Sequence, residues 1–170
     1  MSKFLSNLKI GTKLAVGFGV ATLMLIFVIF TSINSLNSLD NDVELLANDR
    51  FPKTVLANEI INAVQDNAQS LRNMLLSDDI NIKTETLKNF DWAKELVNKN
   101  FDKLTQMVTS DKGKELLAKM KKVRFDEYFP AREKLLKEYN AGNKEGAIQL
   151  LFGEFSRAQN NYINAIEDIV

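Results

Sequence analysis

Few side chains in this sequence could do chemistry, because the residue types of most catalytic and metal sites are missing. The 170-residue chain contains no His and no Cys. General-base catalysis by His, zinc sites with His ligands and Cys nucleophiles are therefore excluded. Neither a G-x-x-x-x-G-K phosphate loop nor a G-x-S-x-G turn occurs. We expect a protein that is not an enzyme and that uses no cofactor.

Acidic side chains offer no better candidate for a metal site. Asp78 and Asp79 are adjacent, but they fall where one helical pattern ends and the next begins. Carboxylates at such a position are typical capping and turn groups exposed to solvent. We therefore interpret them as turn residues and expect no metal site.

Arginine and tyrosine side chains remain, and they suit the binding of a small anion. Arginine donates paired hydrogen bonds to a carboxylate. Arg72 lies about six residues from the predicted turn that ends its helix, and Arg132 lies about ten residues from the turn at Gly142, on a parallel helix. Because each residue of a helix adds the same rise, the two arginines lie at similar height in the predicted bundle. Tyr128 lies one turn from Arg132. These three residues form the predicted ligand site; alternatively they are solvated flanks, with Asp126 and Glu133 available as salt-bridge partners.

The elements that would position these side chains are helices. Apolar residues recur three and four apart in segments 34–77, 82–109, 112–140 and 144–170, without a competing strand pattern. The first stripe comprises Leu36, Leu39, Val43, Leu46, Ala57, Ile60, Val64, Asn67, Leu71 and Met74, interrupted by Arg50 and Lys53. The fourth includes Phe155, Ala158 and Tyr162. Short connections make successive helices antiparallel, so we predict an all-α, up-and-down four-helix bundle.

Local signals mark the helix ends and two interruptions. Ser110 or Asp111 is the expected N-cap of the third helix, Gly142 ends that helix and Asn143 opens the fourth. Two prolines lie inside helical patterns, in "DRFPKT" and "EYFPARE". We favour local bends absorbed by packing of the preceding phenylalanine; alternatively, each bend opens space for a ligand.

An apolar stretch precedes the bundle. Residues 14–33 carry no charged side chain and are long enough to cross a bilayer core of ~30 Å as a helix. A signal peptide would have a shorter apolar region, about 7–15 residues, and an A-x-A-like cleavage site, which "FTSINSLNS" lacks. The core helix of a soluble domain is the other alternative. We predict a transmembrane helix that continues into the first bundle helix.

The charge distribution predicts the orientation of this helix. Lys3, Lys9 and Lys13 precede the apolar stretch, and no Lys or Arg follows until Arg50. The positive-inside rule therefore places residues 1–13 in the cytoplasm and leaves residues 34–170 outside, in the periplasm or the extracellular space. No segment has the clustered basic face that a nucleic-acid interface needs. We expect a membrane protein that does not bind nucleic acid.

Three stretches resemble bacterial methyl-accepting chemotaxis receptors: "IGTKLAVGFGV", "LRNMLLSDD" and "YFPAREKLLKEYNAGNKEGAIQLL". The resemblance covers essentially the whole chain. It implies an inner-membrane homodimer whose outer four-helix bundle binds a small ligand, often an organic acid or amino acid. The family's signal then reaches a methylated cytoplasmic coiled coil that controls a kinase. In the family's aspartate and dicarboxylate sensors, arginines of the first bundle helix hold the ligand, and Arg72 is the nearest match by position.

The sequence also departs from that family. A family receptor has a second span and a methylated signalling rod, and the fourth predicted helix ends about 17 residues short of a return to the membrane. We therefore expect a fragment, a truncated product or a sensor half. The same module occurs on some histidine kinases and cyclic-dinucleotide enzymes. Two further alternatives remain: a membrane-anchored scaffold with Arg50, Lys53 and Asn67 setting the helix register, and a soluble bundle with a secreted amino terminus.

Overall fold

The computed structural model describes residues 9–77 and 79–169, which are helical apart from short turns. No strand occurs among these residues, and the all-α prediction is confirmed. The chain divides into two compact units, Met1–Ala47 and Asn48–Val170. Asp78 and Val170, which the sequence placed in a turn and at a helix end, lie outside the described residues.

The described part of the first unit contains one long helix, α2 (Ile10–Leu45). No charged residue lies in it between Lys13 and Asp40, and none of its residues is buried. This helix is long and apolar enough to cross a membrane. A single helix that is apolar on every side buries that surface only in lipid or against other helices. The predicted span, residues 14–33, falls within it.

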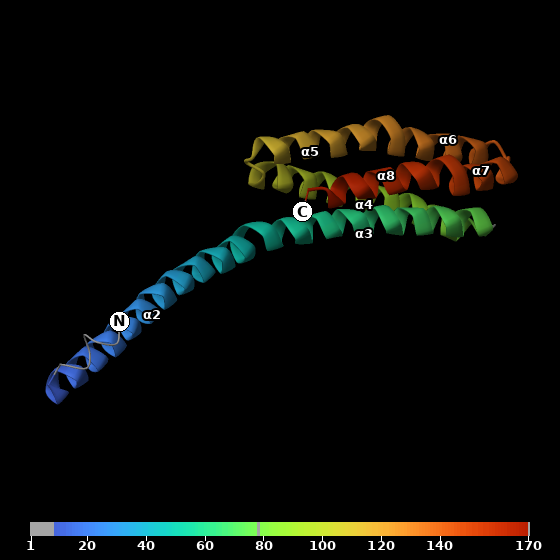
Figure 1. Ribbon diagram of the computed structural model, residues 1–170. Helices are drawn as coiled ribbons and strands as arrows, with labels where there is room; N and C mark the ends of the chain where they lie inside the picture. The colour runs from blue at the N-terminus through green and yellow to red at the C-terminus, as the bar shows by residue number, and fades with distance from the viewer. Residues whose placement is uncertain (1–8, 78, 170) are drawn as a thin grey trace. The chain divides into compact units, whose positions relative to one another are not determined.

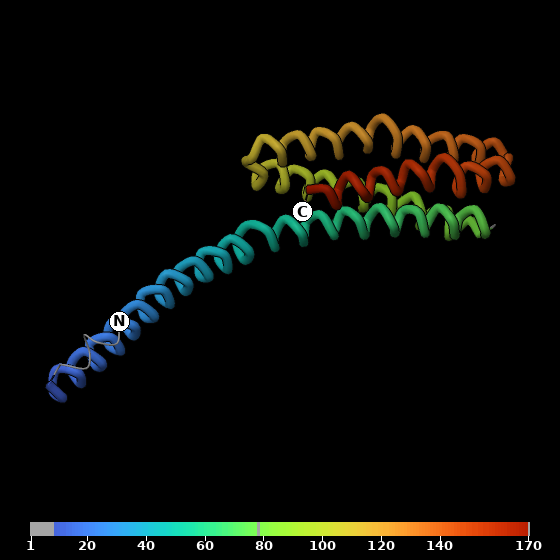
Figure 2. The backbone as a smooth tube through the Cα atoms, in the orientation of Figure 1, coloured from blue at the N-terminus to red at the C-terminus, as the bar shows by residue number. Residues whose placement is uncertain are grey.

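The second unit is an antiparallel bundle of four long helical segments (Figure 1). The first segment is α3 (Phe51–Leu76), which follows the π-helical turn η1 (Leu46–Arg50), and the second is α4 (Ile80–Met107). The third segment consists of α5 (Asp111–Val123), the π-helical turn η2 (Arg124–Tyr128) and α6 (Phe129–Asn140). The fourth consists of α7 (Lys144–Leu150), the π-helical turn η3 (Leu151–Phe155) and α8 (Ser156–Glu167). The tube in Figure 2 follows the chain through these segments. The connections fall where the sequence predicted them.

Capping side chains explain where the helices begin. Asp79 accepts a hydrogen bond from the backbone N–H of Asn81, and Ser110 and Asn143 each accept one from the N–H three residues on. Such caps satisfy backbone donors that the first turn leaves free. Gly142 ends α6 with φ of 80°, a conformation that side chains with a Cβ rarely adopt. The predicted caps at Ser110, Gly142 and Asn143 are confirmed.

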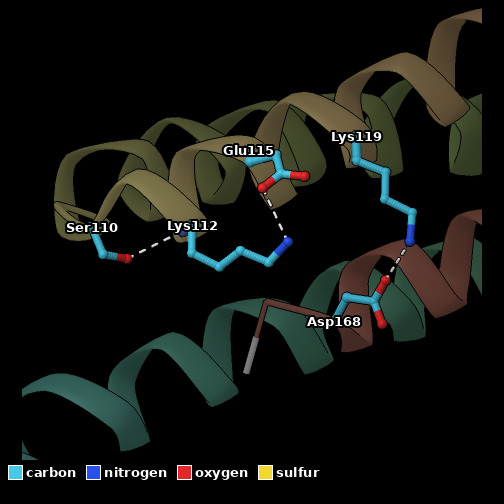
Figure 3. Close-up of polar contacts among 6 residues, drawn as sticks. Ser110, Lys112, Glu115, Lys119 and Asp168 are labelled. Atoms are coloured by element: carbon cyan, nitrogen blue, oxygen red, sulfur yellow. Dashed lines mark hydrogen bonds and ion pairs between the residues drawn. The ribbon is translucent and has the colours of Figure 1, made fainter.

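Ion pairs tie some of these ends together (Figure 3). Lys119 of α5 contacts Asp168 at 2.6 Å, which joins the third and fourth segments. Lys112 and Glu115 pair within the first turns of α5 at 3.0 Å. Both pairs are exposed, so each contributes at most about 1 kcal/mol. The bundle is therefore held by its apolar core.

The bundle helices are not equally spaced. α3 lies close to α4, and the Thr86 hydroxyl of α4 donates to the backbone oxygen of Ser70 at 3.2 Å. Buried Ala63 and Ala93 permit this approach. Fewer backbone positions of α4 approach the α5–η2–α6 segment. That side of the bundle therefore has room for larger groups.

The structure confirms the predicted core of the first bundle helix and one of the two proline interpretations. The bundle part of the first stripe is buried, namely Ala57, Ile60, Val64, Asn67, Leu71 and Met74. Pro52 and Pro130 each follow a π-helical turn, η1 and η2, and the helix continues through both. Phe129 is half-buried as expected, but Phe51 is 67% exposed. The interpretation that Phe51 packing absorbs the first proline was therefore wrong.

Candidate functional site

One face of the α5–η2–α6 segment presents polar side chains to the bundle. Arg124, Tyr128 and Arg132 are four residues apart, which places them on one side of a helix. Arg124 is 6% exposed and Tyr128 is 2% exposed, while Arg132 is half-buried. Arginine is rarely buried this deeply, because removing a cation from water is costly unless a partner compensates. This face is therefore a candidate site.

The π-helical turn η2 contributes to this placement. The backbone N–H of Phe129 donates to the oxygen of Arg124, five residues earlier. Pro130 has no N–H and could not bond to the oxygen of Asp126 in a regular α-helix. A π-helical turn next to the proline accommodates this missing donor by adding a residue to the turn. Such turns occur frequently at functional sites.

Aromatic rings contact both guanidinium groups. The centre of the Phe129 ring lies 4.9 Å from the guanidinium carbon of Arg124 and 4.9 Å from that of Arg132. Arg132 also lies 5.2 Å from the Phe90 ring on α4. Cation–π contacts of this kind contribute roughly 0.5–2 kcal/mol each. They bring no acceptor oxygen, so they leave the N–H groups of both arginines available.

No carboxylate of the described residues forms an ion pair with Arg124 or Arg132. Burial lowers the pKa of Arg124; Tyr162 and Tyr128 oppose this shift, and Arg132 adds to it. Two cations on one face that form no ion pair with a described carboxylate favour the binding of a negatively charged group.

Four buried side-chain atoms lack a hydrogen-bond partner of good geometry in the described part of the chain, and all belong to this cluster: Asn67 Oδ1, Tyr128 Oη, Arg132 Nε and Tyr162 Oη. The two tyrosine rings are 5.3 Å apart, and the pKa of Tyr128, which burial raises, is lowered in part by Arg132 and by a side-chain hydrogen bond with Asn67, so the Tyr128 hydroxyl is partly satisfied within the cluster. Each unsatisfied polar group costs about 1–3 kcal/mol. Native proteins contain few of them. Their concentration here favours an external hydrogen-bonding ligand.

Burial also fixes the charge of the two tyrosines. It raises the pKa of Tyr128 and of Tyr162 above the ordinary value of 10.0, although the nearby arginines lower it in part. Both hydroxyls are therefore neutral near pH 7, and each can donate one hydrogen bond and accept others. Together with the guanidinium groups they form a set of donors suited to an anion.

A cleft of about 270 Å³ opens beside Arg124, between α4 and the α5–η2 segment. It is lined by Asn98, Phe101 and Asp102 of α4, by Met120, Lys121, Arg124 and Phe125, and by Tyr162 of α8. Arg124 and Lys121 could hold a carboxylate, since both are cationic donors. The aromatic walls would cover an apolar part of the same molecule. The cleft therefore fits a small carboxylate.

The structure brings together two of the three predicted site residues. Arg132 and Tyr128 belong to the cluster, and Arg132 acts on the pKa of Tyr128. Arg72 is exposed on α3, about 100° around the helix from buried Leu71. No contact among the described residues joins Arg72 to the other two. The ligand role of all three remains a prediction.

Sequence reasoning missed two residues of this cluster. Arg124 lies four residues before Tyr128 and eight before Arg132, so an extension of the same spacing could have identified it. Tyr162 was placed in the apolar stripe of the fourth helix, and its burial agrees with that. Its proximity to Arg124 depends on the packing of α8, which the sequence pattern does not specify.

No group of three or more acidic side chains that could hold a metal ion occurs among residues 9–77 and 79–169. The family described as "four helix bundle sensory module for signal transduction" matches residues 7–170. No curated protein matches the chain.

Proposed function

The chain belongs to the family of four-helix-bundle sensory modules for signal transduction, and we propose that it is the ligand-sensing part of a bacterial chemoreceptor. In this proposal α2 anchors the protein in the inner membrane through residues 14–33. The bundle then lies outside the cytoplasm, where it meets solutes. The lysines that precede the apolar stretch and the exposure of α2 support this arrangement.

The ligand in this proposal is a small molecule with a carboxylate. Arg124 and Lys121, which line the cleft of about 270 Å³, bind the carboxylate, and the hydroxyl of Tyr162 orients it. Tyr128 and Arg132 adjoin Arg124 on the same face and have a supporting role in the site. One observation carries the proposal: every buried, unpartnered side-chain atom of the described residues lies in this one cluster. Arg72 lies on another face of the bundle, so a direct role for it requires a second contact site.

A homodimer is part of the same proposal. Leu36, Leu39 and Val43 of α2 form an apolar stripe, and each is more than half exposed. Stripes with this spacing pack against an equivalent helix in coiled coils. The stripe therefore supports pairing with a second copy of the chain.

Calorimetric titration of the full chain in lipid nanodiscs tests the ligand. Acetate, succinate and benzoate are the probes, and we expect at least one to bind saturably. Arg124→Met should abolish that binding, because it removes the buried cation and retains an apolar side chain of similar length. Arg157→Met, which removes an exposed arginine of α8, is the matched control and should bind normally. No heat with any probe would favour a scaffold without a carboxylate ligand.

A further inference from the structure

A second cleft, of about 240 Å³, lies between α3 and α4 and differs in character from the first. It is lined mainly by Asp66, Asn67, Gln69 and Asn73 of α3 and by Asn89 and Trp92 of α4. Four of these six side chains are amides, one is a carboxylate and one is a large aromatic ring. None of the residues lining the cleft is a Lys or an Arg.

This composition selects the class of ligand. Each amide side chain offers an acceptor oxygen and two N–H donors, so a row of amides can bind hydroxyl groups, which also donate and accept. Without a lining cation the cleft offers nothing to neutralise a carboxylate or a phosphate. A neutral molecule with several hydroxyl groups satisfies these conditions.

Asn67, which also belongs to the arginine–tyrosine cluster, supplies a buried polar atom at this cleft. This side chain lines the cleft, is 5% exposed, and its Oδ1 has no hydrogen-bond partner among the described residues. The neighbouring amide of Asn89, by contrast, donates to the Ser70 hydroxyl at 3.3 Å. A hydroxyl group of a ligand would supply the donor that Asn67 needs.

Trp92 supplies the apolar side of the cleft. It is 55% exposed, which is unusual for a large aromatic residue with no covering element among the described residues. A flat, exposed indole face can cover the apolar C–H face of a ring, and aromatic side chains commonly provide such surfaces in ligand sites. The ligand should therefore have an apolar face as well as hydroxyl groups.

We infer that the α3–α4 cleft binds a neutral sugar ring, with the ring's C–H face on Trp92 and its hydroxyls on Asn67, Asn73, Asn89 and Asp66. This site is separate from the proposed carboxylate site, apart from Asn67, which also influences the pKa of Tyr128. The cleft volume suits one ring better than a long chain. The module would then sense two chemically different solutes.

Trp92 makes the test direct, because it is the only tryptophan in the chain. Its fluorescence in the full chain in nanodiscs reports on this cleft alone. D-glucose, D-galactose and D-mannose are the probes, and glycerol, which has hydroxyls but no ring, is the control. We expect at least one sugar to change the emission saturably and to protect Trp92 from acrylamide quenching. Calorimetry under the same conditions detects binding that leaves the emission unchanged.

Matched variants separate this site from the rest of the protein. Asn73→Ala removes an exposed amide of the cleft and should weaken sugar binding about tenfold or more. Asn62→Ala removes an exposed amide of the same helix that does not line the cleft, and it should bind normally. Arg124→Met should leave sugar binding intact, so failure of the carboxylate proposal would be distinguishable from failure of this one.

Three results would overturn the inference. One is the absence of any emission change or heat with all three sugars at about 10 mM, a concentration that detects even weak sites. Another is sugar binding that Asn73→Ala leaves unchanged, because the sugar would then bind elsewhere. Binding of glycerol with the same affinity would also contradict it, since stacking on Trp92 would then contribute nothing.

Discussion

Arg124 is a buried cation whose cost in folding free energy points to a role in ligand binding. Its guanidinium is buried among aromatic rings and forms no ion pair with a carboxylate of the described residues, so its desolvation is only partly offset. Replacing buried charged groups by apolar side chains of similar size is often neutral or stabilising. The burial of Arg124 is therefore better explained by ligand binding than by a contribution to packing.

We therefore expect Arg124→Met to unfold at equal or higher urea concentration than the unchanged protein. The expected gain in the free energy of unfolding is about 0–3 kcal/mol without ligand. The exposed Arg157→Met control should change it by less than about 0.5 kcal/mol. Urea denaturation followed by circular dichroism measures both. A loss above about 2 kcal/mol for Arg124→Met would identify this arginine as a structural residue.

The buried tyrosines predict how stability depends on pH. Folding raises the pKa of Tyr128 and Tyr162, so the unfolded chain loses these protons first, near pH 10. Their contribution to stability is therefore constant below about pH 10 and decreases as the pH rises further. Between pH 8 and pH 11, the urea midpoint of the Tyr128→Phe, Tyr162→Phe double variant should fall less steeply than that of the unchanged protein. Tyr139→Phe, at a half-buried position, is the control. Equal slopes for all three proteins would contradict burial of these hydroxyls.

At the scale of helices, two glycines should respond to alanine in opposite directions. Gly142 ends α6 with φ of 80°, where a Cβ costs about 1–2 kcal/mol. Gly153 lies inside the π-helical turn η3, and a Cβ there meets no described atom within 4 Å other than those of its chain neighbours and the adjacent helix backbone. Gly153→Ala should stabilise the fold by about 0.5–1 kcal/mol through lower backbone entropy in the unfolded chain. Thermal denaturation measures both, and the same sign for both variants would contradict the assigned helix ends.

The helices were predictable because local chemistry specifies them. Ser110, Gly142 and Asn143 cap or end helices through hydrogen bonds and backbone angles that depend on a few neighbouring residues. The apolar stripe on α3 likewise follows from the period of a helix, and it identified Asn67 as a buried position. These features need no knowledge of the partner helices.

The π-helical turns and the composition of the site were not predictable in the same way. A proline predicts an interruption, and the structure resolves it as η1 before Pro52 and η2 before Pro130. η3 has no proline at all. Tyr162 reaches the cluster only through the packing of α8 against α5. Contacts between distant segments depend on interhelical spacing, which side-chain periodicity leaves open.

At the scale of the whole molecule, the proposed function depends on the side of the membrane that the bundle occupies. A sensor of outside solutes must place the bundle outside the cytoplasm, and the lysines before residue 14 favour that orientation. Length and composition allow α2 to cross the membrane, but orientation follows from charge alone. This proposal is therefore testable separately from ligand binding.

The chain contains no cysteine, so single-cysteine variants report on membrane orientation without further changes. Asn62→Cys introduces a thiol at an exposed position of the bundle, and Ser6→Cys introduces one before the apolar stretch. In intact spheroplasts, a membrane-impermeant maleimide should label Asn62→Cys and should label Ser6→Cys only after lysis. The reverse pattern would place the bundle in the cytoplasm, because the positive-inside rule would then have failed for these lysines. Labelling of Asn62→Cys in a soluble fraction that lacks residues 1–30 would instead support a secreted bundle without an anchor.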